Sequence, residues 1–478
     1  MTGGHDLADL DGVAQADLVA RGDVTATELV EAAIARIEAF NPALNAVVYP
    51  SFDEALAVAA TNPTGPFGGV PYLLKDLIVE RAGTPFSEGS RFLAGHVSTF
   101  TSELAARLER AGLVIVGRTN TPEFGMAPTC EPVLHGPARN PWDPGRSTAG
   151  SSGGAAAAVA SGMVPMAHAN DLGGSIRYPA SACGLFGLKP TRARIPLGPQ
   201  YGDVLSGGGC EHVLTRTVRD SAAVLDATHG PAPGDPYPAP PVARPFVHEV
   251  GADPGRLRVA YSRVTPEGPL GHPDCLAALD DAVALLDALG HEVTEVAFTG
   301  ITPEVGAAFG TMINAAMAWI MDYWVRELGR APGPDELEPA TRALWEAGRG
   351  VSAADYLHAV EEMQRFSRGV AQFLADVDMW LTPTLSAPPL PIGVMVSTDD
   401  DPLGGLAKGG ETVRYAGVIA NVTGNPAMSV PLWWNGDGLP IGVHFLGRFG
   451  DEATLFRLAS QLEAARPWTD RRPPVSAV

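Results

Sequence analysis

The sequence predicts an α/β protein in which helices flank a mixed central β-sheet. Short apolar runs, typical of buried strands, alternate with amphipathic helical patterns along most of the chain. Hydrophobic residues make up 45% of the 478 residues and charged residues only 18%, which favours a large core and excludes a disordered chain. The alternation continues on both sides of a segment with seven prolines, residues 229–246. We therefore expect this stiff segment to cross the surface and both halves to supply strands to one sheet.

The first half of the chain contains two predicted helices and a strand. Residues 23–40 predict a core-facing helix, because apolar residues recur at helical spacing and Thr25 followed by Glu28 forms a capping box. Residues 102–112 predict a second helix, and residues 113–116 predict a buried strand that follows it. A helix that leads into a strand is the unit from which α/β folds are built.

The second half continues the pattern and adds a helical region. We expect strands at 257–262 and 292–296 with a helix at 274–289 between them. Residues 302–378 predict long helices rich in aromatic residues, which form a cap over the core. Aromatic side chains at helical spacing more often pack in a core than bind a ligand, so core packing is the favoured interpretation.

The C-terminal region predicts a loop and a closing motif. Residues 394–412 are rich in Gly and Asp and have few apolar anchors, which favours a mobile loop. Residues 421–468 predict a hairpin with its turn at 435–438, followed by a helix.

We expect one domain over residues 1–478. Its core covers about 20–300 and 379–470, and its cap covers about 302–378. A domain boundary in the proline-rich segment is the alternative.

Charge and composition exclude several classes of protein. The net charge is −21 and no cluster of Lys and Arg is present, which argues against a nucleic-acid partner. No window of 18 apolar residues occurs and the first 12 residues are acidic, so we expect a soluble, cytoplasmic protein without a membrane partner. Four cysteines are scattered without a CxxC pair, which favours reduced core thiols over a zinc site or disulfides: Cys130, Cys183, Cys210 and Cys275.

Two glycine-rich turns carry serines. The first, AGSSGG at 149–154, leads into an alanine run at 155–160 that favours a helix, so its N–H groups lie where a helix begins. The second, DLGGS at 171–175, has two glycines that allow successive N–H groups to point at a ligand, as in an oxyanion hole. Glycine-serine turns are common, so the two turns alone indicate little.

A lysine at the end of an apolar run gives the turns a chemical context. GVPYLLKD at 69–76 predicts a short buried strand that ends at Lys75. Burial disfavours the charged form of a lysine and lowers its pKa, so Lys75 is a candidate base near neutral pH.

These motifs resemble the amidase signature family of serine hydrolases. The similarity covers GVPxxxKD, the SSGG turn, DxGGSxRxPA and CGLxGLKPT, and extends from about residue 20 to 470. It implies that Ser175 is the nucleophile, Lys75 the base and Ser151 a bridging serine held by a cis peptide bond. It also implies three further groups of residues: an oxyanion hole of Leu172, Gly173 and Gly174, a substrate-binding loop of Gly125, Met126, Ala127, Pro128 and Thr129, and supporting Ser152, Asp171 and Arg177.

The sequence departs from the family pattern at a few positions. Thr148-Ala149 replaces a frequent pair of glycines, Asn170 replaces a usual threonine, and His444 replaces a frequent glutamine. We expect the first two departures to affect only fine geometry, since neither residue is expected to touch a triad position.

The resemblance implies a hydrolase of neutral amide or carbamate C–N bonds that works through an acyl-enzyme. Within the family, the motifs are most similar to cyclic-amide hydrolases that act on nylon oligomers and to related urethanases. We expect a small-molecule substrate, no cofactor, no metal, and a monomer or homodimer.

Four alternatives remain open. Residues 150–154 satisfy GxSxG with Ser152 as nucleophile, but that motif requires a buried strand before the turn, and we expect none in residues 140–146. A phosphate-binding loop would need a lysine after the glycines, and none is present. An amidotransferase A-type subunit that acts with a partner chain on acylated tRNA is disfavoured by the acidic charge. His168 is the alternative base, although we interpret it as structural.

Overall fold

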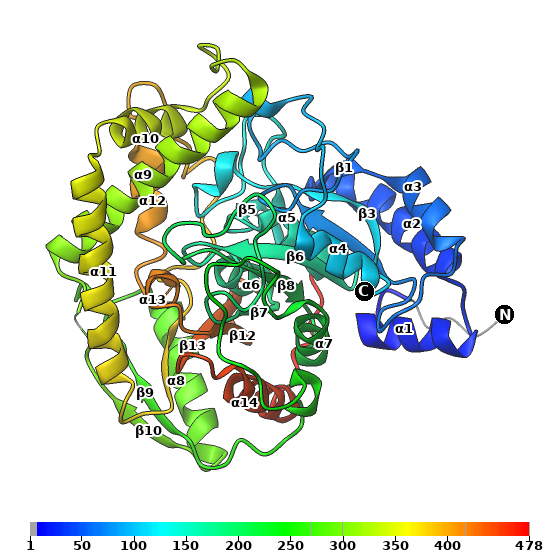
Figure 1. Ribbon diagram of the computed structural model, residues 1–478. Coiled ribbons are helices and arrows are strands. Elements are labelled where there is room, and N and C mark those ends of the chain that lie inside the picture. The colour runs from blue at the N-terminus through cyan, green and yellow to red at the C-terminus, as the bar shows by residue number, and fades with distance from the viewer. Residues whose placement is uncertain (1–6, 269, 299, 416, 478) are drawn as a thin grey trace.

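The computed structural model describes residues 7–268, 270–298, 300–415 and 417–477. A twisted sheet of eleven strands runs through the middle of the molecule, with helices on both faces (Figure 1). The strands lie in this order across the sheet: β1 (Val47–Pro50), β3 (Val114–Thr119), β2 (Pro71–Lys75), β6 (Met166–Asp171), β8 (Cys210–Thr215), β7 (Phe186–Lys189), β12 (Ala427–Trp434), β13 (Pro440–Gly447), β11 (Met379–Pro383), β9 (Arg258–Tyr261) and β10 (Glu292–Glu295).

The sheet is mixed, as predicted. Strand β2 is parallel to β3 and to β6, whereas β6, β8, β7, β12 and β13 are joined by antiparallel pairings. Strands from both sides of the proline-rich segment pair through β7 and β12, so both halves of the chain build one sheet. The predicted strands at 257–262 and 292–296 are β9 and β10, which pair in parallel.

Helices of the first half lie along the sheet from β1 as far as β13. They are α1 (Gly12–Arg21), α2 (Ala26–Leu44), α3 (Phe52–Ala59), α4 (Glu103–Arg110), α5 (Gly153–Ala160), α6 (Arg177–Cys183) and α7 (Val218–Thr228), with the short η1 (Arg91–Leu93) and η2 (Glu123–Gly125). The Thr25–Glu28 capping box is present at the start of α2. This helix continues past the predicted end to Leu44. Pro42 is tolerated because it lies in the last turn, where it removes few helical hydrogen bonds.

Helices of the second half lie over the other end of the sheet. They are α8 (Pro273–Ala288), α9 (Pro303–Leu328), α10 (Pro339–Arg349), α11 (Ala353–Phe373), α12 (Gly404–Gly410), α13 (Gly417–Thr423) and α14 (Glu452–Ala465), with the short η3 (Phe246–His248). The loop predicted over 394–412 is wrong for its second part, because α12 lies there with Gly405 buried against the backbone of Met395. The hairpin of β12 and β13 and its turn at 435–438 are confirmed.

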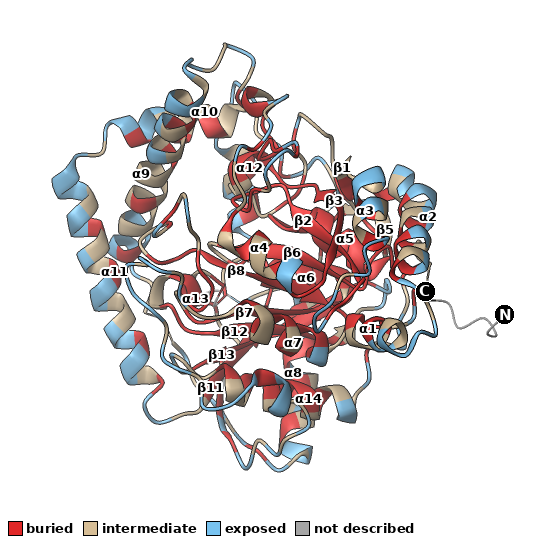
Figure 2. Ribbon diagram, turned by 45° about the vertical axis from the view of Figure 1, so that its right-hand side comes forward, coloured by how far each residue is buried: buried red, intermediate tan, exposed pale blue. Residues whose placement is uncertain are grey.

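The region at 302–378 is helical, as predicted. Helices α9, α10 and α11 lie together at one side of the molecule, and the outward faces of α10 and α11 are exposed (Figures 1 and 2). Trp324 of α9 is 1% exposed and packs in a hydrophobic cluster with Phe86 and Phe92. Core packing therefore holds for Trp324, whereas Trp319 is 40% exposed.

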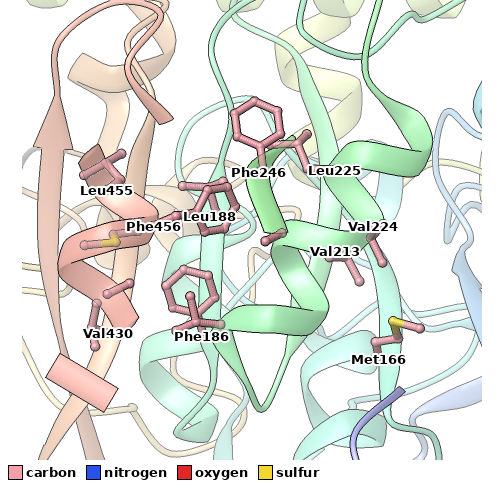
Figure 3. Packing of buried hydrophobic residues seen from close by; sticks show 14 of the residues in the cluster. Met166, Phe186, Leu188, Val213, Val224, Leu225, Phe246, Val430, Leu455 and Phe456 are labelled. Atoms are coloured by element: carbon pink, nitrogen blue, oxygen red, sulfur yellow. The ribbon is translucent and has the colours of Figure 1, made fainter. Parts of the chain in front are cut away.

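The largest hydrophobic cluster lies between the sheet and the helices α7 and α14. Phe186 and Leu188 of β7 face Phe456 of α14 and Leu225 of α7 (Figure 3). Phe246, at the end of the proline-rich segment, packs against Phe456 at 5.7 Å between ring centroids. Each such buried side chain contributes about 1.5–3 kcal/mol to stability, so this cluster anchors the otherwise exposed segment.

Residues 140–146, directly before the first glycine-rich turn, contain no buried strand, as we expected. Strands β4 (Arg139–Asn140) and β5 (Asp143–Ser147) form a two-stranded hairpin there. Strand β5 is mostly half-buried or exposed and lies outside the main sheet. The hairpin therefore does not supply the buried strand that a GxSxG nucleophile requires.

Two further features concern the described residues as a whole. All four cysteines are buried and free of disulfides, as expected. None of the described helices is both long and apolar enough to cross a membrane.

Candidate active site

Lys75 is the last residue of β2 and its side chain is fully buried. Its Nζ atom lies 2.7 Å from Ser151 Oγ, 3.0 Å from Ser152 Oγ and 2.6 Å from Asn170 Oδ1. The two serines come from the turn before α5, and Asn170 comes from β6, which pairs with β2. The structure thus brings Lys75 into contact with Ser151 and Ser152, which lie far from it in the sequence.

The contacts of Asn170 correct an expectation from the sequence. We expected its departure from the family pattern to affect only fine geometry, but its side chain contacts Lys75 directly. Its Nδ2 donates to Leu77 O at 3.2 Å, which fixes Oδ1 as the atom that faces the lysine. The pairing of β6 with β2 could not be predicted from the sequence, because the register between distant segments cannot be derived from residue spacing.

Burial lowers the pKa of Lys75 from about 10.5 to about 7, although Glu211 raises it somewhat. All three contacts of Nζ are uncharged groups, and no carboxylate in the described part of the chain forms an ion pair with it. A large fraction of Lys75 is therefore neutral at physiological pH.

The hydrogen bonds define how a neutral Lys75 is oriented. Asn170 Oδ1 can only accept, and Ser152 Oγ donates its own proton to Asn170 O at 3.2 Å, so it accepts from the lysine. These two contacts use both N–H groups of a neutral amine. The nitrogen lone pair then faces Ser151 Oγ and can accept its proton.

His168 is fully occupied by other contacts. Its Nδ1 accepts from the backbone N–H of Lys75 at 3.1 Å, so Nε2 carries the proton and lies 2.5 Å from Glu211 Oε2. Neither ring nitrogen faces a serine. These contacts favour our interpretation that His168 is structural.

Ser175 lies in the turn between β6 and α6 and is half-buried. The carboxylate of Asp171 organises this turn, since it accepts from the N–H groups of Gly174 at 2.7 Å and Ile176 at 3.1 Å. Arg177 donates to both oxygens of the same carboxylate. Burial alone would raise the pKa of Asp171, but the charge and hydrogen bonds of Arg177 more than offset this and lower it. The carboxylate is therefore a fixed charge.

The bond from Gly174 changes the expected oxyanion hole. Because its N–H donates to Asp171 Oδ1, it does not point freely at a ligand as we expected. No hydrogen bond among the described residues uses the N–H groups of Leu172, Gly173 or Ser175. These three groups are the available donors in the turn.

Two more residues complete the support of the turn: Asn421, which no motif marked, and His444, which the sequence showed only as a departure from the family pattern. Asn421 of α13 donates to Asp171 O at 2.8 Å and accepts from Arg177 at 2.7 Å. His444 Nε2 accepts from Arg177 Nη1 at 2.9 Å, so its imidazole is neutral. Burial, followed by the charge of Arg177, lowers the pKa of His444 well below its usual value.

Ser175 faces an apolar cavity of about 330 Å³. Gly125, Met126, Ala127 and Pro128 line it, as do Leu172 and Gly173. Helix α9 closes another side with apolar and aromatic side chains: Phe309, Ile313, Ala316, Met317, Trp319 and Ile320. Thr129, which we expected to bind substrate, is buried, does not line the cavity, and bonds to Ser147 Oγ and Glu131.

Ser151 lies between Lys75 and the cavity wall. The peptide bond that precedes it is cis, as the resemblance implies. A Cβ atom at Gly125, a residue of the cavity lining, would lie 3.4 Å from Ser151 Oγ. The hydroxyl of Ser151 is thus in contact with Lys75 on one side and close to the cavity on the other.

The site contains no metal-binding group of side chains. Among the described residues, His, Cys, Asp and Glu side chains nowhere gather in a group of three that could hold a metal ion.

Comparisons with known proteins agree with the predicted fold and family. The protein family described as Amidase matches residues 28–456. A 6-aminohexanoate-cyclic-dimer hydrolase of Paenarthrobacter ureafaciens is 37% identical over 474 residues, which cover 97% of this chain and 96% of that protein. A solved structure of such a hydrolase with substrate superimposes with a TM-score of 0.94 at 36% identity, and covers 98% of this chain and 99% of that one.

Two more distant structures are also similar. A bacterial aryl acylamidase has a TM-score of 0.86 at 26% identity, with coverage of 96% of this chain and 98% of that one. The A-type subunit of the glutamyl-tRNA(Gln) amidotransferase of Thermotoga maritima has a TM-score of 0.76 at 26% identity, with coverage of 99% of both chains.

The fold and the site therefore define a hydrolase of amide C–N bonds. More specifically, the chain belongs to the amidase signature family, as the sequence motifs indicated.

Gly174→Ala tests how tightly the turn is built. Gly174 has φ +127°, which L side chains rarely adopt, and a Cβ atom there would overlap the ring of Tyr178. We expect a lower melting temperature and loss of amide hydrolysis. Gly436→Ala, in an open hairpin turn, is the matched control and should leave both unchanged. Full activity and wild-type stability of Gly174→Ala would show that the turn tolerates movement.

Proposed function

We propose that this chain hydrolyses neutral amide and carbamate C–N bonds through a covalent acyl- or carbamoyl-enzyme on Ser175. One observation carries the proposal: a buried lysine that can be neutral contacts Ser151 beside an apolar cavity, and Ser175 faces that cavity. A neutral amine oriented toward a hydroxyl is a general base, and a hydroxyl that loses its proton is a nucleophile.

The proton relay starts at Lys75. Its lone pair accepts the proton of Ser151, and Ser151 accepts the proton of Ser175 as Ser175 Oγ forms a bond to the carbonyl carbon. The developing oxyanion accepts hydrogen bonds from the free N–H groups of the turn, those of Leu172, Gly173 and Ser175. Loss of one such donor typically costs about 2.7–4 kcal/mol of transition-state stabilisation.

The second half of the reaction returns the proton. Lys75 gives it back through Ser151 to the nitrogen of the leaving group, the C–N bond breaks, and a neutral amine departs. Water then attacks the acyl or carbamoyl carbon, and the same relay accepts its proton. Ser175 is released when its oxygen recovers a proton.

The apolar cavity supports a neutral substrate. Its walls are aliphatic and aromatic, and burial of a charge there without a partner costs several kcal/mol. The names of two relatives point the same way, since one acts on a cyclic dimer of 6-aminohexanoate and another is an aryl acylamidase. We extend the proposal to carbamates because their carbonyl and leaving amine have the same geometry.

The proposal also covers the domain organisation, the cellular location and the oligomeric state of the protein. We propose that the chain is one domain in which α9, α10 and α11 form a cap over the cavity, since α9 supplies much of its lining. The net charge of −21, which favours solubility, supports a cytoplasmic protein that works as a monomer or homodimer.

An amidotransferase A-type subunit is the weaker alternative. Acylated tRNA is a polyanion, and a chain with a net charge of −21 repels it. The amidotransferase protein is also less similar in structure than the cyclic-dimer hydrolase, with TM-scores of 0.76 and 0.94.

Covalent trapping tests the assignment of the serines. Ser175→Ala should abolish labelling by a fluorophosphonate, and Ser151→Ala should slow it severely, because the nucleophile remains but its proton path is cut. Ser161→Ala is the control and should label like the wild type, because the hydroxyl of this buried serine donates only to backbone carbonyls of α5. Wild-type labelling of Ser151→Ala combined with loss of activity in a folded His168 variant would indicate a histidine base instead.

The pH dependence tests the base. Since only neutral Lys75 accepts a proton and its pKa is about 7, kcat/KM should rise as the pH increases through 7. Asn170→Asp places a carboxylate beside Nζ, which stabilises the ammonium form and should move the rise to higher pH by about 1 or more.

Two controls sharpen this measurement. Asn62→Asp adds the same charge at an exposed turn and should leave the pH profile unchanged. Lys75→Arg should be almost inert, because a guanidinium does not lose its proton at accessible pH. An unchanged profile in Asn170→Asp, or activity in Lys75→Arg, contradicts the assignment of Lys75.

The substrate class is tested with purified single chain. We expect hydrolysis of neutral anilides, aryl carbamates and nylon oligomers, because the cavity is apolar. Charged amino-acid amides should be poor substrates. Turnover of only the charged amides, or a strict need for a second protein chain, contradicts the proposal and favours the amidotransferase alternative.

A further inference from the structure

Two buried polar side chains of the cavity lining have no role in the relay. Glu88 and Tyr201 both line the cavity and are 1% and 4% exposed. Most other side chains of the lining are apolar. Burial of a carboxyl and a phenol hydroxyl beside an otherwise apolar cavity is costly unless each has a hydrogen-bond partner.

The backbone of Ile78 links the two chain segments that carry Glu88 and Tyr201. Its N–H donates to Glu88 Oε1 at 3.4 Å, and its carbonyl accepts from Nε2 of Gln200, the neighbour of Tyr201, at 2.9 Å. The backbone of Ile78 has φ +64°, so the chain turns sharply here. Tyr201 and Ile78 also belong to one hydrophobic cluster.

Glu88 has only donors as partners. Its Oε1 accepts from Ile78, and its Oε2 accepts from Trp324 Nε1 at 3.1 Å. No cation among the described residues pairs with it. Burial raises the pKa of Glu88 to about 8; the bond from Trp324 lowers it in part, and the negative charge of Glu80 raises it further. The carboxyl is thus mostly protonated at neutral pH and has an O–H to donate.

Tyr201 is a second unused donor. Its ring is held by Trp319 and Tyr323 of α9, with centroids at 5.5 and 5.8 Å. Its hydroxyl makes no hydrogen bond within the described part of the chain. The hydroxyl oxygen is nevertheless not fully buried. Burial, and then the charge of Glu88, raise the pKa of Tyr201 well above its usual value. It therefore remains a neutral phenol.

We infer that Glu88 and Tyr201 together bind the carbonyl oxygen of a second, non-scissile amide of the substrate. This inference rests on the proposed function. A carbonyl oxygen has two lone pairs, so it can accept from both donors at once. The scissile carbonyl is held at the turn of Ser175, and the apolar walls between suit a methylene spacer. An ammonium group is disfavoured, because it would face two donors and no fixed anion.

The experiment compares two substrates in the full-length protein. One is a linear diamide, and the other is a matched monoamide in which methylenes replace the second amide. The spacer of the diamide is chosen from a series as the one with the highest kcat/KM. In the wild type we expect a higher kcat/KM for the diamide than for the monoamide. Tyr201→Phe should reduce this ratio of diamide to monoamide kcat/KM about five- to tenfold, which corresponds to the contribution of one hydrogen bond. The change should appear mainly in KM.

Tyr323→Phe is the matched control. It removes a hydroxyl from a tyrosine that contacts the ring of Tyr201 but does not line the cavity, so the ratio should stay at the wild-type value. A third substrate carries an ammonium group in place of the second amide. Preference for this ammonium substrate over the diamide overturns the inference, and so does a wild-type ratio in folded Tyr201→Phe.

The outcomes separate this inference from the proposed function. If the wild type hydrolyses both substrates with equal kcat/KM, the inference fails while the proposed function stands. If it hydrolyses no amide at all, both fail.

Discussion

The site depends on one constraint: a lysine is buried with neutral partners only. A carboxylate at hydrogen-bond distance would hold Lys75 in its charged form, which cannot accept a proton. The chain instead places two hydroxyls and an amide oxygen around Nζ. The free energy cost of burying the amine is reduced because the neutral form can be buried with all of its hydrogen bonds satisfied.

The surrounding fold supplies this neutral environment. Strand β2 is fully buried and ends at Lys75, and the side chain of Asn170 on the neighbouring strand β6 contacts this lysine. Glu211, the carboxyl group that raises the pKa of Lys75 most, is bonded to His168, whose other nitrogen accepts from the backbone of Lys75. The histidine therefore places a hydrogen-bonded ring between the lysine and the carboxylate. In this respect His168 supports Lys75, the proposed base.

Several features of the fold could be predicted from the sequence, because each of them depends on residues that are neighbours in the chain. The capping box at Thr25, the strand that ends at Lys75 and the turn at 435–438 all follow from neighbouring residues. Asn170 and Asn421 could not be recognised, because their importance comes from contacts across strands and helices distant in the chain. Helix α12 was missed because its glycine-rich sequence has low helical propensity, and only tertiary packing stabilises it.

The end of β6 shows how charge is sorted within the site. Asn170 and Asp171 are consecutive, and successive side chains of a strand point to opposite faces. The neutral amide therefore faces Lys75, while the carboxylate faces Arg177 and orders the turn of Ser175. An ionised pair stabilises the position of Ser175, the proposed nucleophile, and a neutral group favours the neutral form of Lys75, the proposed base. Exchange of these two residues would place the negative charge beside Lys75, so their order along the strand is itself a requirement of the proposed relay.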